Sequence, residues 1–216
     1  MSVPPQSGPT ARPGAQPAAQ PVPTAAAPAQ PAARYWDRYV GGKGWRKHAP
    51  SGPPGEELAD LRAGLGQTAG TVPALWPYYT SPTDGEVTAE LDAEHGALAL
   101  YGLHQQSQLR PMHQRGVGLG TALRALREAD RYSPEALDRR VAAAVSANST
   151  QILLFRLRGL IPQLRGESIA LDYGRLLTDL TLWPRPDSRQ RVRRTWGLAY
   201  HAWKPTGDAA DAPPGA

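Results

Sequence analysis

Residues 109–165 begin LRPMHQRGVGLGTALRALR (109–127) and end DRRVAAAVSANSTQILLFRLRGLIPQLR (138–165). This stretch holds ten arginines and four acidic residues, an excess of six positive charges, whereas the formal net charge of the whole chain is +5. About a quarter of the 216 residues therefore carries the net charge. The arginines are Arg110, Arg115, Arg124, Arg127, Arg131, Arg139, Arg140, Arg156, Arg158 and Arg165.

A helix is predicted to begin after Ser133. Ser133 is typical of an N-cap, because Pro134 fits the first helical turn and Glu135 suits the positive end of the helix dipole. Arg139 and Arg140 fall on the face opposite the apolar residues. Those apolar residues recur at helical spacing, at Leu137, Val141, Ala144 and Val145.

A second helix is predicted after Ser149, which can again serve as the N-cap. Its apolar stripe consists of Leu153, Leu157, Leu160 and Leu164. Arg158 and Arg165 are seven residues apart and therefore share a side of this helix. Each of the two helices is expected to bury one face and to present arginines on another.

The rest of residues 34–204 also shows helical patterns with short Pro- and Gly-rich connections and no strand-like alternation. The predicted fold is therefore all-α, a helical bundle in one body or as two small lobes. The expected segments are a first helix within 34–48, a helix at 56–65, a helical turn at 71–79, a helix carrying Val87 inward after a capping box at 83–86, and helices at 119–129, 169–183 and after Asp187 as N-cap. The last helix is expected to place on its outer arc Arg189, Arg191, Arg193 and Arg194.

Both ends of the chain have the composition of disordered segments. Residues 1–33 are a Pro/Ala/Gln segment with Arg12 as its only charged side chain, and residues 205–216 are rich in Pro, Gly and Ala. Such segments bury too little apolar surface to offset the entropy of ordering. The expected domains are a disordered tail at 1–33, a helical domain at 34–204 and a disordered tail at 205–216.

Composition narrows the class of protein. The chain has no cysteine, which excludes a disulfide framework and thiolate chemistry. It shows no secretory signal and no membrane-length apolar run, so a soluble cytoplasmic protein is expected. The isoelectric point near 9.7 favours an acidic partner such as nucleic acid, although an Ala-, Gly-, Pro- and Arg-rich composition also follows from a GC-rich genome.

No catalytic, metal or cofactor site is expected. His95, His104 and His113 are nine residues apart, whereas two ligands on one helix face need a spacing of three or four. The glycines of GVGLG (116–120) lack the Lys-Ser/Thr of a phosphate-binding loop. No nucleophile stands beside a base, so the protein is predicted not to be an enzyme.

Eight motifs in one order give the chain a family resemblance between residues 56 and 203. Their succession resembles the CasB family, the small subunit of type I-E CRISPR Cascade complexes. The motifs are LRAGLG (61–66), VPALWPYY (72–79), LHQQSQLRPMH (103–113), GVGLGTALRALR (116–127), LDRRVAAAVSANS (137–149), LLFRLRGLIPQLR (153–165), IALDYGRLLTDLTLW (169–183) and RVRRTWGLAY (191–200).

The resemblance implies a non-catalytic helical subunit of an RNA-guided surveillance complex for antiviral defence. Its implied partners are the other Cascade subunits, the crRNA, the target DNA single strands of the R-loop and a second copy of itself, with no membrane. Members of the family help to hold the R-loop open without reading sequence, because the guide RNA reads sequence by base pairing.

The resemblance also implies nucleic-acid-binding positions. The positions that match the family are Arg62, Arg110, His113, Arg139, Arg140 and Arg158. Charge and helical phase alone add Arg124, Arg156 and Arg165. Two other functions stay open: a protein-only assembly adaptor whose arginines dock acidic subunit surfaces, and a sequence-specific duplex DNA binder, which would need a helix-turn-helix pattern.

Overall fold

The computed structural model describes residues 1, 33–42, 44–129 and 131–202. Apart from residues 1 and 33, the predicted tails at 1–33 and 205–216 lie outside these ranges, so their disorder stays a prediction. The predicted all-α class is confirmed for the part of the chain that is described. Its elements are α1 (Tyr35–Tyr39), β1 (Val40–Gly41), β2 (Gly44–Trp45), α2 (Gly55–Ala63), the 3-10 helix η1 (Pro73–Tyr78), α3 (Ala89–Gln105), α4 (Leu119–Glu128), α5 (Pro134–Val145), α6 (Thr150–Gly166), α7 (Tyr173–Leu182) and α8 (Pro186–Tyr200).

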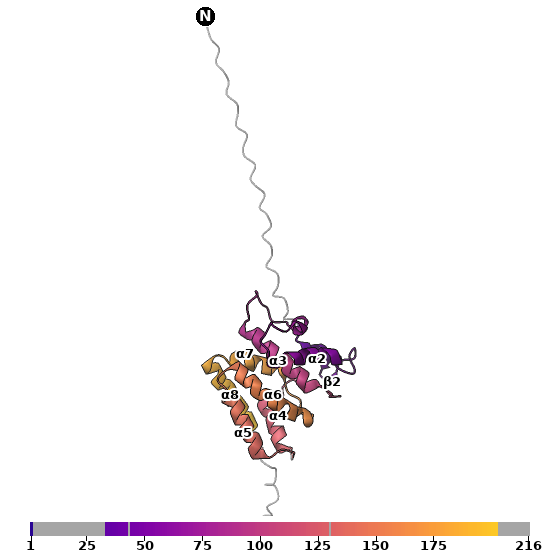
Figure 1. The fold of residues 1–216 in the computed structure, drawn as a ribbon, viewed down its shortest axis with the longest axis vertical. Helices are drawn as coiled ribbons and strands as arrows, with labels where there is room; N and C mark the ends of the chain where they lie inside the picture. Colours follow the sequence, from indigo (N-terminus) through magenta and orange to yellow (C-terminus); the bar gives the residue numbers. More distant parts are fainter. Residues whose placement is uncertain (2–32, 43, 130, 203–216) are drawn as a thin grey trace, which may run out of the picture. The chain divides into compact units, whose positions relative to one another are not determined.

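Helix α3 lies at the centre of the packing and contacts α2, α6 and α7 (Figure 1). Every residue from Ala93 to Gly102 is buried, because neighbours cover the helix on several sides. Helix α4 packs against α8, and α5 packs against α6. Most buried apolar residues between Tyr35 and Tyr200 form one cluster, to which each of the helices α1 to α8 contributes, so these helices share a core.

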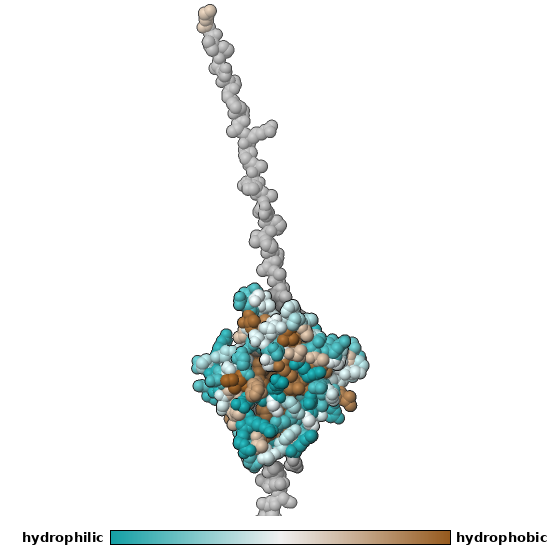
Figure 2. Space-filling view, viewed as in Figure 1, coloured by the Kyte–Doolittle hydropathy of each residue, from teal (hydrophilic) through white to brown (hydrophobic). Residues whose placement is uncertain are grey.

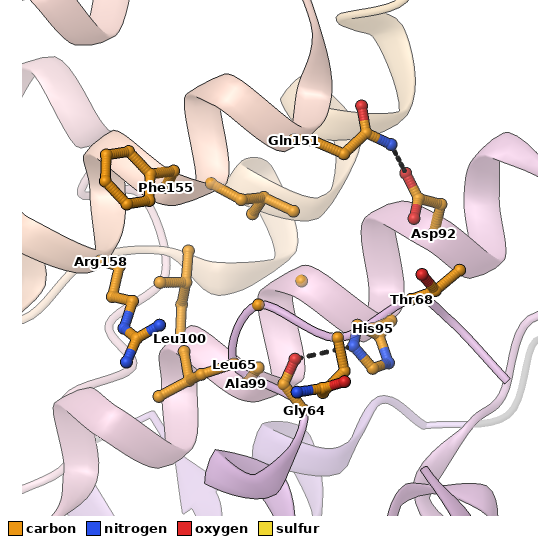
Figure 3. A pocket seen from close by; sticks show the side chains of 14 residues that line it. Gly64, Leu65, Thr68, Asp92, His95, Ala99, Leu100, Gln151, Phe155 and Arg158 are labelled. Atoms are coloured by element: carbon orange, nitrogen blue, oxygen red, sulfur yellow. Dashed lines mark hydrogen bonds between the residues drawn. The ribbon is translucent and has the colours of Figure 1, made fainter. Parts of the chain in front are cut away.

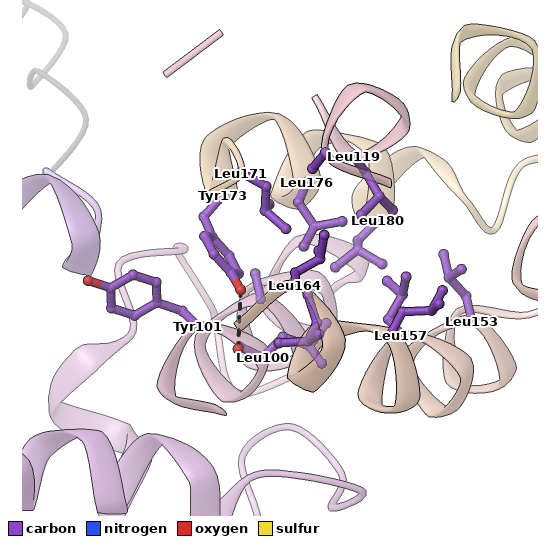
Figure 4. Packing of buried hydrophobic residues seen from close by; sticks show 14 of the residues in the cluster. Leu100, Tyr101, Leu119, Leu153, Leu157, Leu164, Leu171, Tyr173, Leu176 and Leu180 are labelled. Carbon is purple, nitrogen blue, oxygen red and sulfur yellow. Dashed lines mark hydrogen bonds between the residues drawn. The ribbon is translucent and has the colours of Figure 1, made fainter. Parts of the chain in front are cut away.

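Leucines of α6 turn toward α4 and α7 in this core (Figure 4). Leu153, Leu157 and Leu164 are each 0% exposed, as predicted from their spacing. Leu119 of α4 and Leu176 of α7 are also buried. Burial of an aliphatic side chain contributes about 1.5–3 kcal/mol, so this stripe fixes the rotation of α6 about its axis.

Of the predicted helix caps, Ser133 and Ser149 are confirmed, whereas the capping box at 83–86 and Asp187 are wrong. The Oγ of Ser133 accepts a hydrogen bond from the backbone N–H of Ala136, and Ser149 does the same for Ile152, so both predicted caps are confirmed. The predicted capping box at 83–86 is wrong. Residues 83–86 form a turn in which Thr83 Oγ1 donates to the Glu86 carbonyl, and the cap of α3 is Thr88.

Because α3 begins only after Thr88, Val87 lies before the helix. It is 53% exposed and does not point into the core as predicted. The predicted cap at Asp187 is also wrong. Helix α8 already begins at Pro186, and Asp187 lies in its first turn. The fixed φ of proline suits the first helical position, which explains the earlier start.

A buried carboxylate ties the N-terminal segment to α3. Glu94 is 1% exposed and accepts hydrogen bonds from the Arg34 guanidinium at 2.9 Å and from the backbone N–H groups of Thr80 and Ser81 at 2.8–3.1 Å. Burial would raise the pKa of Glu94, but the hydrogen bonds from Thr80 and Ser81 outweigh it and lower the pKa. Arg34 also pairs with Glu90 of α3 at 2.6 Å, so one guanidinium binds two carboxylates of this helix.

We predict that Gly102→Ala destabilises the fold by about 1–3 kcal/mol. A Cβ there would lie 2.7 Å from Leu61 Cβ and 3.1 Å from the Leu58 carbonyl oxygen, where α2 and α3 approach each other. The control is Gly197→Ala in α8, where a Cβ meets no atom within 4 Å and alanine is the better helix former. Urea unfolding measures both, and equal stability of the two variants would contradict the packing described.

We predict that acid destabilises the protein partly through Glu94. Its folded-state pKa lies below the ordinary 4.5, so the unfolded chain binds the proton more tightly, and stability falls as the pH drops through and below 4.5. Glu94→Gln should lower stability at pH 7 by about 1–3 kcal/mol and flatten this acid limb. The control is Glu86→Gln at an exposed position. If the free energy of unfolding falls with pH equally steeply in the wild type and in Glu94→Gln, Glu94 is not the source of the acid sensitivity.

Candidate nucleic-acid interface

Three of the predicted arginines line one groove between α5 and α6. Because both helices bury their apolar stripes, Arg139 and Arg140 of α5 and Arg156 of α6 are exposed on the outer side. The groove has a volume of about 530 Å³ and is also lined by Ala143 and Gln163. We call it the α5–α6 groove. The structure thus brings together arginines that are sixteen or more residues apart in the sequence.

Most other arginines of the 109–165 stretch are paired with acids. Arg127 binds Asp138 at 2.9 Å, which together with Tyr200 lowers the pKa of Asp138. Further pairs are Arg115 with Asp37 at 2.7 Å, Arg131 with Glu167 at 3.2 Å and Arg124 with Glu128 at 3.7 Å. Within the described part of the chain, the arginines of this stretch without an acidic or backbone partner are Arg110, Arg139, Arg140, Arg156 and Arg158.

Five predicted arginines lie outside the α5–α6 groove, namely Arg62, Arg110, Arg124, Arg158 and Arg165. Arg62 is half-buried on α2, and Arg110 is exposed in the connection between α3 and α4. Arg158 is exposed on α6 but lines a second cavity, of about 280 Å³, between α3, α6 and residues 64–68. We call this second cavity the α3–α6 cavity.

His113, Arg165 and Arg124 are engaged inside the fold. His113 is 3% exposed and its Nδ1 accepts a hydrogen bond from the backbone N–H of Tyr173 at 3.1 Å. Burial lowers the pKa of His113, so its ring is neutral near pH 7. Arg165 donates to the Leu103 carbonyl at 3.1 Å, and Arg124 donates to the Ala202 carbonyl at 3.0 Å. These three side chains make contacts within the fold and are not part of the proposed interface.

Two arginines expected on the outer arc of α8 hold the turn between α5 and α6 instead. Arg193 donates to the Ala147 carbonyl and Arg189 to the Asn148 carbonyl, both at 2.8 Å. The Arg193 guanidinium also lies 5.6 Å from the ring centre of Trp183. Helix α8 therefore helps to set the position of the two helices that form the groove.

Sequence reasoning missed Phe155. Its side chain is 68% exposed, and it lines both the α5–α6 groove and the α3–α6 cavity. The Arg156 guanidinium lies 5.7 Å from its ring centre, within the range of a cation–π contact. The sequence held a signal, because Phe155 is the only phenylalanine of the chain and lies out of phase with the leucines of α6. Figure 2 shows exposed apolar side chains amid hydrophilic surroundings in the middle of the face in view.

Three histidines lie in the core. His95, His104 and His113 are buried, and burial lowers the pKa of each, that of His104 to about 3. Among the described residues, no group of three or more His, Cys, Asp or Glu side chains is placed to hold a metal ion. Nor does any described helix have the length and apolar character needed to cross a membrane.

The comparisons with known proteins agree on one family. The family model for CRISPR-associated protein Cse2 matches residues 57–201. The solved structure of CasB from Thermobifida fusca is similar with a TM-score of 0.57 and 35% sequence identity, covering 68% of this chain and 85% of that one. A CRISPR-associated protein of the Cse2 family from Thermus thermophilus is similar with a TM-score of 0.52 and 26% identity, covering 67% of this chain and 85% of that one.

A chain of a CRISPR RNA-guided surveillance complex shares the fold, with a TM-score of 0.54 and 21% identity, covering 69% of this chain and 82% of that one. No curated protein sequence matches.

We predict that the two faces of α6 respond differently to truncation. Phe155→Ala should change the free energy of unfolding by less than about 0.5 kcal/mol, because the side chain is exposed. Leu157→Ala, at a position that is 0% exposed, should cost about 2–5 kcal/mol. Urea unfolding of both variants checks the rotation of α6, and a larger loss for Phe155→Ala would refute it.

Proposed function

The chain belongs to the Cse2 family of CRISPR-associated proteins, and on that premise we propose that it is a non-catalytic small subunit of an RNA-guided surveillance complex. The complex is of the type I-E Cascade class and acts in the cytoplasm. The subunit binds nucleic-acid backbone without sequence specificity and stabilises the R-loop in antiviral defence. Its partners are the other Cascade subunits, the crRNA, the single strands of the target DNA and a second copy of itself.

The observation that carries this proposal is the set of exposed arginines in the α5–α6 groove. Arg139, Arg140 and Arg156 have no salt-bridge partner among the described residues, so their guanidinium groups are available to an external anion. The planar guanidinium binds phosphate oxygens in a bidentate manner. A groove between two helices presents these groups along a path, which suits an extended backbone better than a single small anion.

The energetics of the R-loop give such contacts a purpose. The RNA–DNA heteroduplex is about as stable as the DNA duplex that it replaces, so protein contacts with the backbone can shift the balance. If the five arginines of residues 109–165 that have neither an acidic nor a backbone partner, Arg110, Arg139, Arg140, Arg156 and Arg158, all meet single-strand phosphates, log affinity should fall against log salt concentration with a slope of about −3.5.

The alternative function is a protein-only adaptor, in which the same arginines dock acidic surfaces of neighbouring subunits. An exposed arginine attracts a carboxylate as well as a phosphate. The two functions differ in what fails when the charge is reversed, because an adaptor loses assembly and a backbone-binding subunit loses DNA.

We predict that Arg139→Glu/Arg140→Glu leaves assembly of the surveillance complex intact and lowers its retention of R-loop DNA by about tenfold or more, because each reversal replaces an attraction to phosphate by a repulsion. The control is Arg185→Glu/Arg194→Glu, which makes the same change in net charge at exposed positions of the α8 region. Co-purification of subunits and crRNA measures assembly, and filter binding measures DNA retention.

Loss of the subunit from the complex in the Arg139/Arg140 variant, with the control variant still incorporated, would contradict the proposal and favour the adaptor. If both variants retain the same amount of DNA, any loss of DNA comes from the change in net charge and not from the position of Arg139 and Arg140.

A further inference from the structure

The α3–α6 cavity combines apolar walls with polar groups, and the proposed function uses only Arg158 of the residues that line it. Its walls are apolar, with Leu65, Ala99, Leu100 and Leu154 around a volume of about 280 Å³. It borders the α5–α6 groove, because Phe155 lines both. A backbone that follows the arginines therefore passes the mouth of this cavity.

Polar groups stand at its two ends (Figure 3). At one end Gln151 Nε2 donates to Asp92 Oδ2 at 3.4 Å, a long hydrogen bond that a ligand can replace. At the other end lie Phe155 and the guanidinium of Arg158. Gln151, Phe155 and Arg158 have the spacing i, i+4, i+7 and therefore lie along one face of α6.

The opposite wall is held in place by buried hydrogen bonds. His95 contacts the Gly64 carbonyl through Nε2 at 2.9 Å and the Tyr79 hydroxyl through Nδ1 at 2.7 Å. Gly66 follows with a φ of +78°, and a Cβ there would lie 3.4 Å from Arg158 Nη1. The wall is thus preformed, and a side chain at residue 66 would be strained by the positive φ.

We propose that this cavity accepts a single unstacked nucleobase from the strand held in the α5–α6 groove. Phe155 offers its ring to the base at the mouth, the apolar walls enclose the base faces, and Arg158 holds the adjoining phosphate. Asp92 and Gln151 bond the base edge. The inference rests on the proposed function and adds to it the group that is bound beside the backbone.

A nucleobase fits these features better than an apolar side chain of a partner protein. An apolar side chain would cover the Asp92 carboxylate and the Gln151 amide with no partner beyond their own long hydrogen bond, which leaves most of their hydrogen-bonding capacity unsatisfied. The amide of Gln151 can present either its oxygen or its NH₂ group, so it accommodates any base edge. The site therefore agrees with binding that ignores sequence.

The test compares two single-stranded DNAs of equal length, one ordinary and one built entirely of abasic sites, on the full-length protein at low salt. We expect the wild type to bind the abasic strand about tenfold more weakly, which corresponds to about 1.4 kcal/mol.

Phe155→Ala should bind the ordinary strand about tenfold more weakly and no longer distinguish the two strands, since stacking of a base on an aromatic ring is lost. Gln151→Ala should lose about threefold on the ordinary strand only, as expected for one modest hydrogen bond. The control is Ile152→Ala, because Ile152 is an exposed apolar residue of α6 that lines neither the α5–α6 groove nor the α3–α6 cavity.

Each other outcome overturns the inference in a distinguishable way. Equal binding of both strands by the wild type removes the base site and leaves the proposed function standing. No binding of either strand removes both. Full base dependence in Gln151→Ala, together with loss in Phe155→Ala, shows that the base stacks on the ring outside the cavity. If the variants bind both strands like the wild type but leave the assembled complex, the cavity holds a protein side chain.

Discussion

The buried leucine stripe of α6 is the constraint on which the rest of the arrangement depends. A helix that places Leu153, Leu157, Leu160 and Leu164 inside the core at 0–1% exposure has one rotation available to it. That rotation turns Phe155 and Arg156 toward α5 and Arg158 toward the loop after α2. The core packing of one helix thereby sets the position of the surface chemistry on its outer side.

The positions of the acidic residues determine which arginines form ion pairs and which stay unpaired on the surface. Asp37, Glu128, Asp138 and Glu167 pair with arginines at helix ends and connections, so those cations serve the fold. The outer faces of α5 and α6 lack such partners among the described residues and keep their positive charge. Arg189 and Arg193 add a further constraint, since their hydrogen bonds hold the turn that joins α5 to α6. Helix α8 therefore supports the turn from which α5 and α6 diverge.

Local patterns in the sequence predicted much of this, and tertiary contacts account for the rest. The caps at Ser133 and Ser149 and the leucine spacing of α6 are local signals, and they give the correct outward faces of α5 and α6. A charge pattern cannot tell an arginine that binds a distant carbonyl, such as Arg165, from one that meets solvent. The burial of His113 depends on α1 and α7 packing around it, and the cavity beside Phe155 depends on α3, so neither is visible in a window of the sequence.

The most direct test of the central claim is a cryo-EM reconstruction of the purified surveillance complex with an R-loop bound. The account predicts phosphates of a nucleic-acid strand within hydrogen-bond distance of Arg139, Arg140 and Arg156, along the α5–α6 groove. Carboxylates of a neighbouring subunit in the same positions, with the nucleic acid elsewhere, would contradict it.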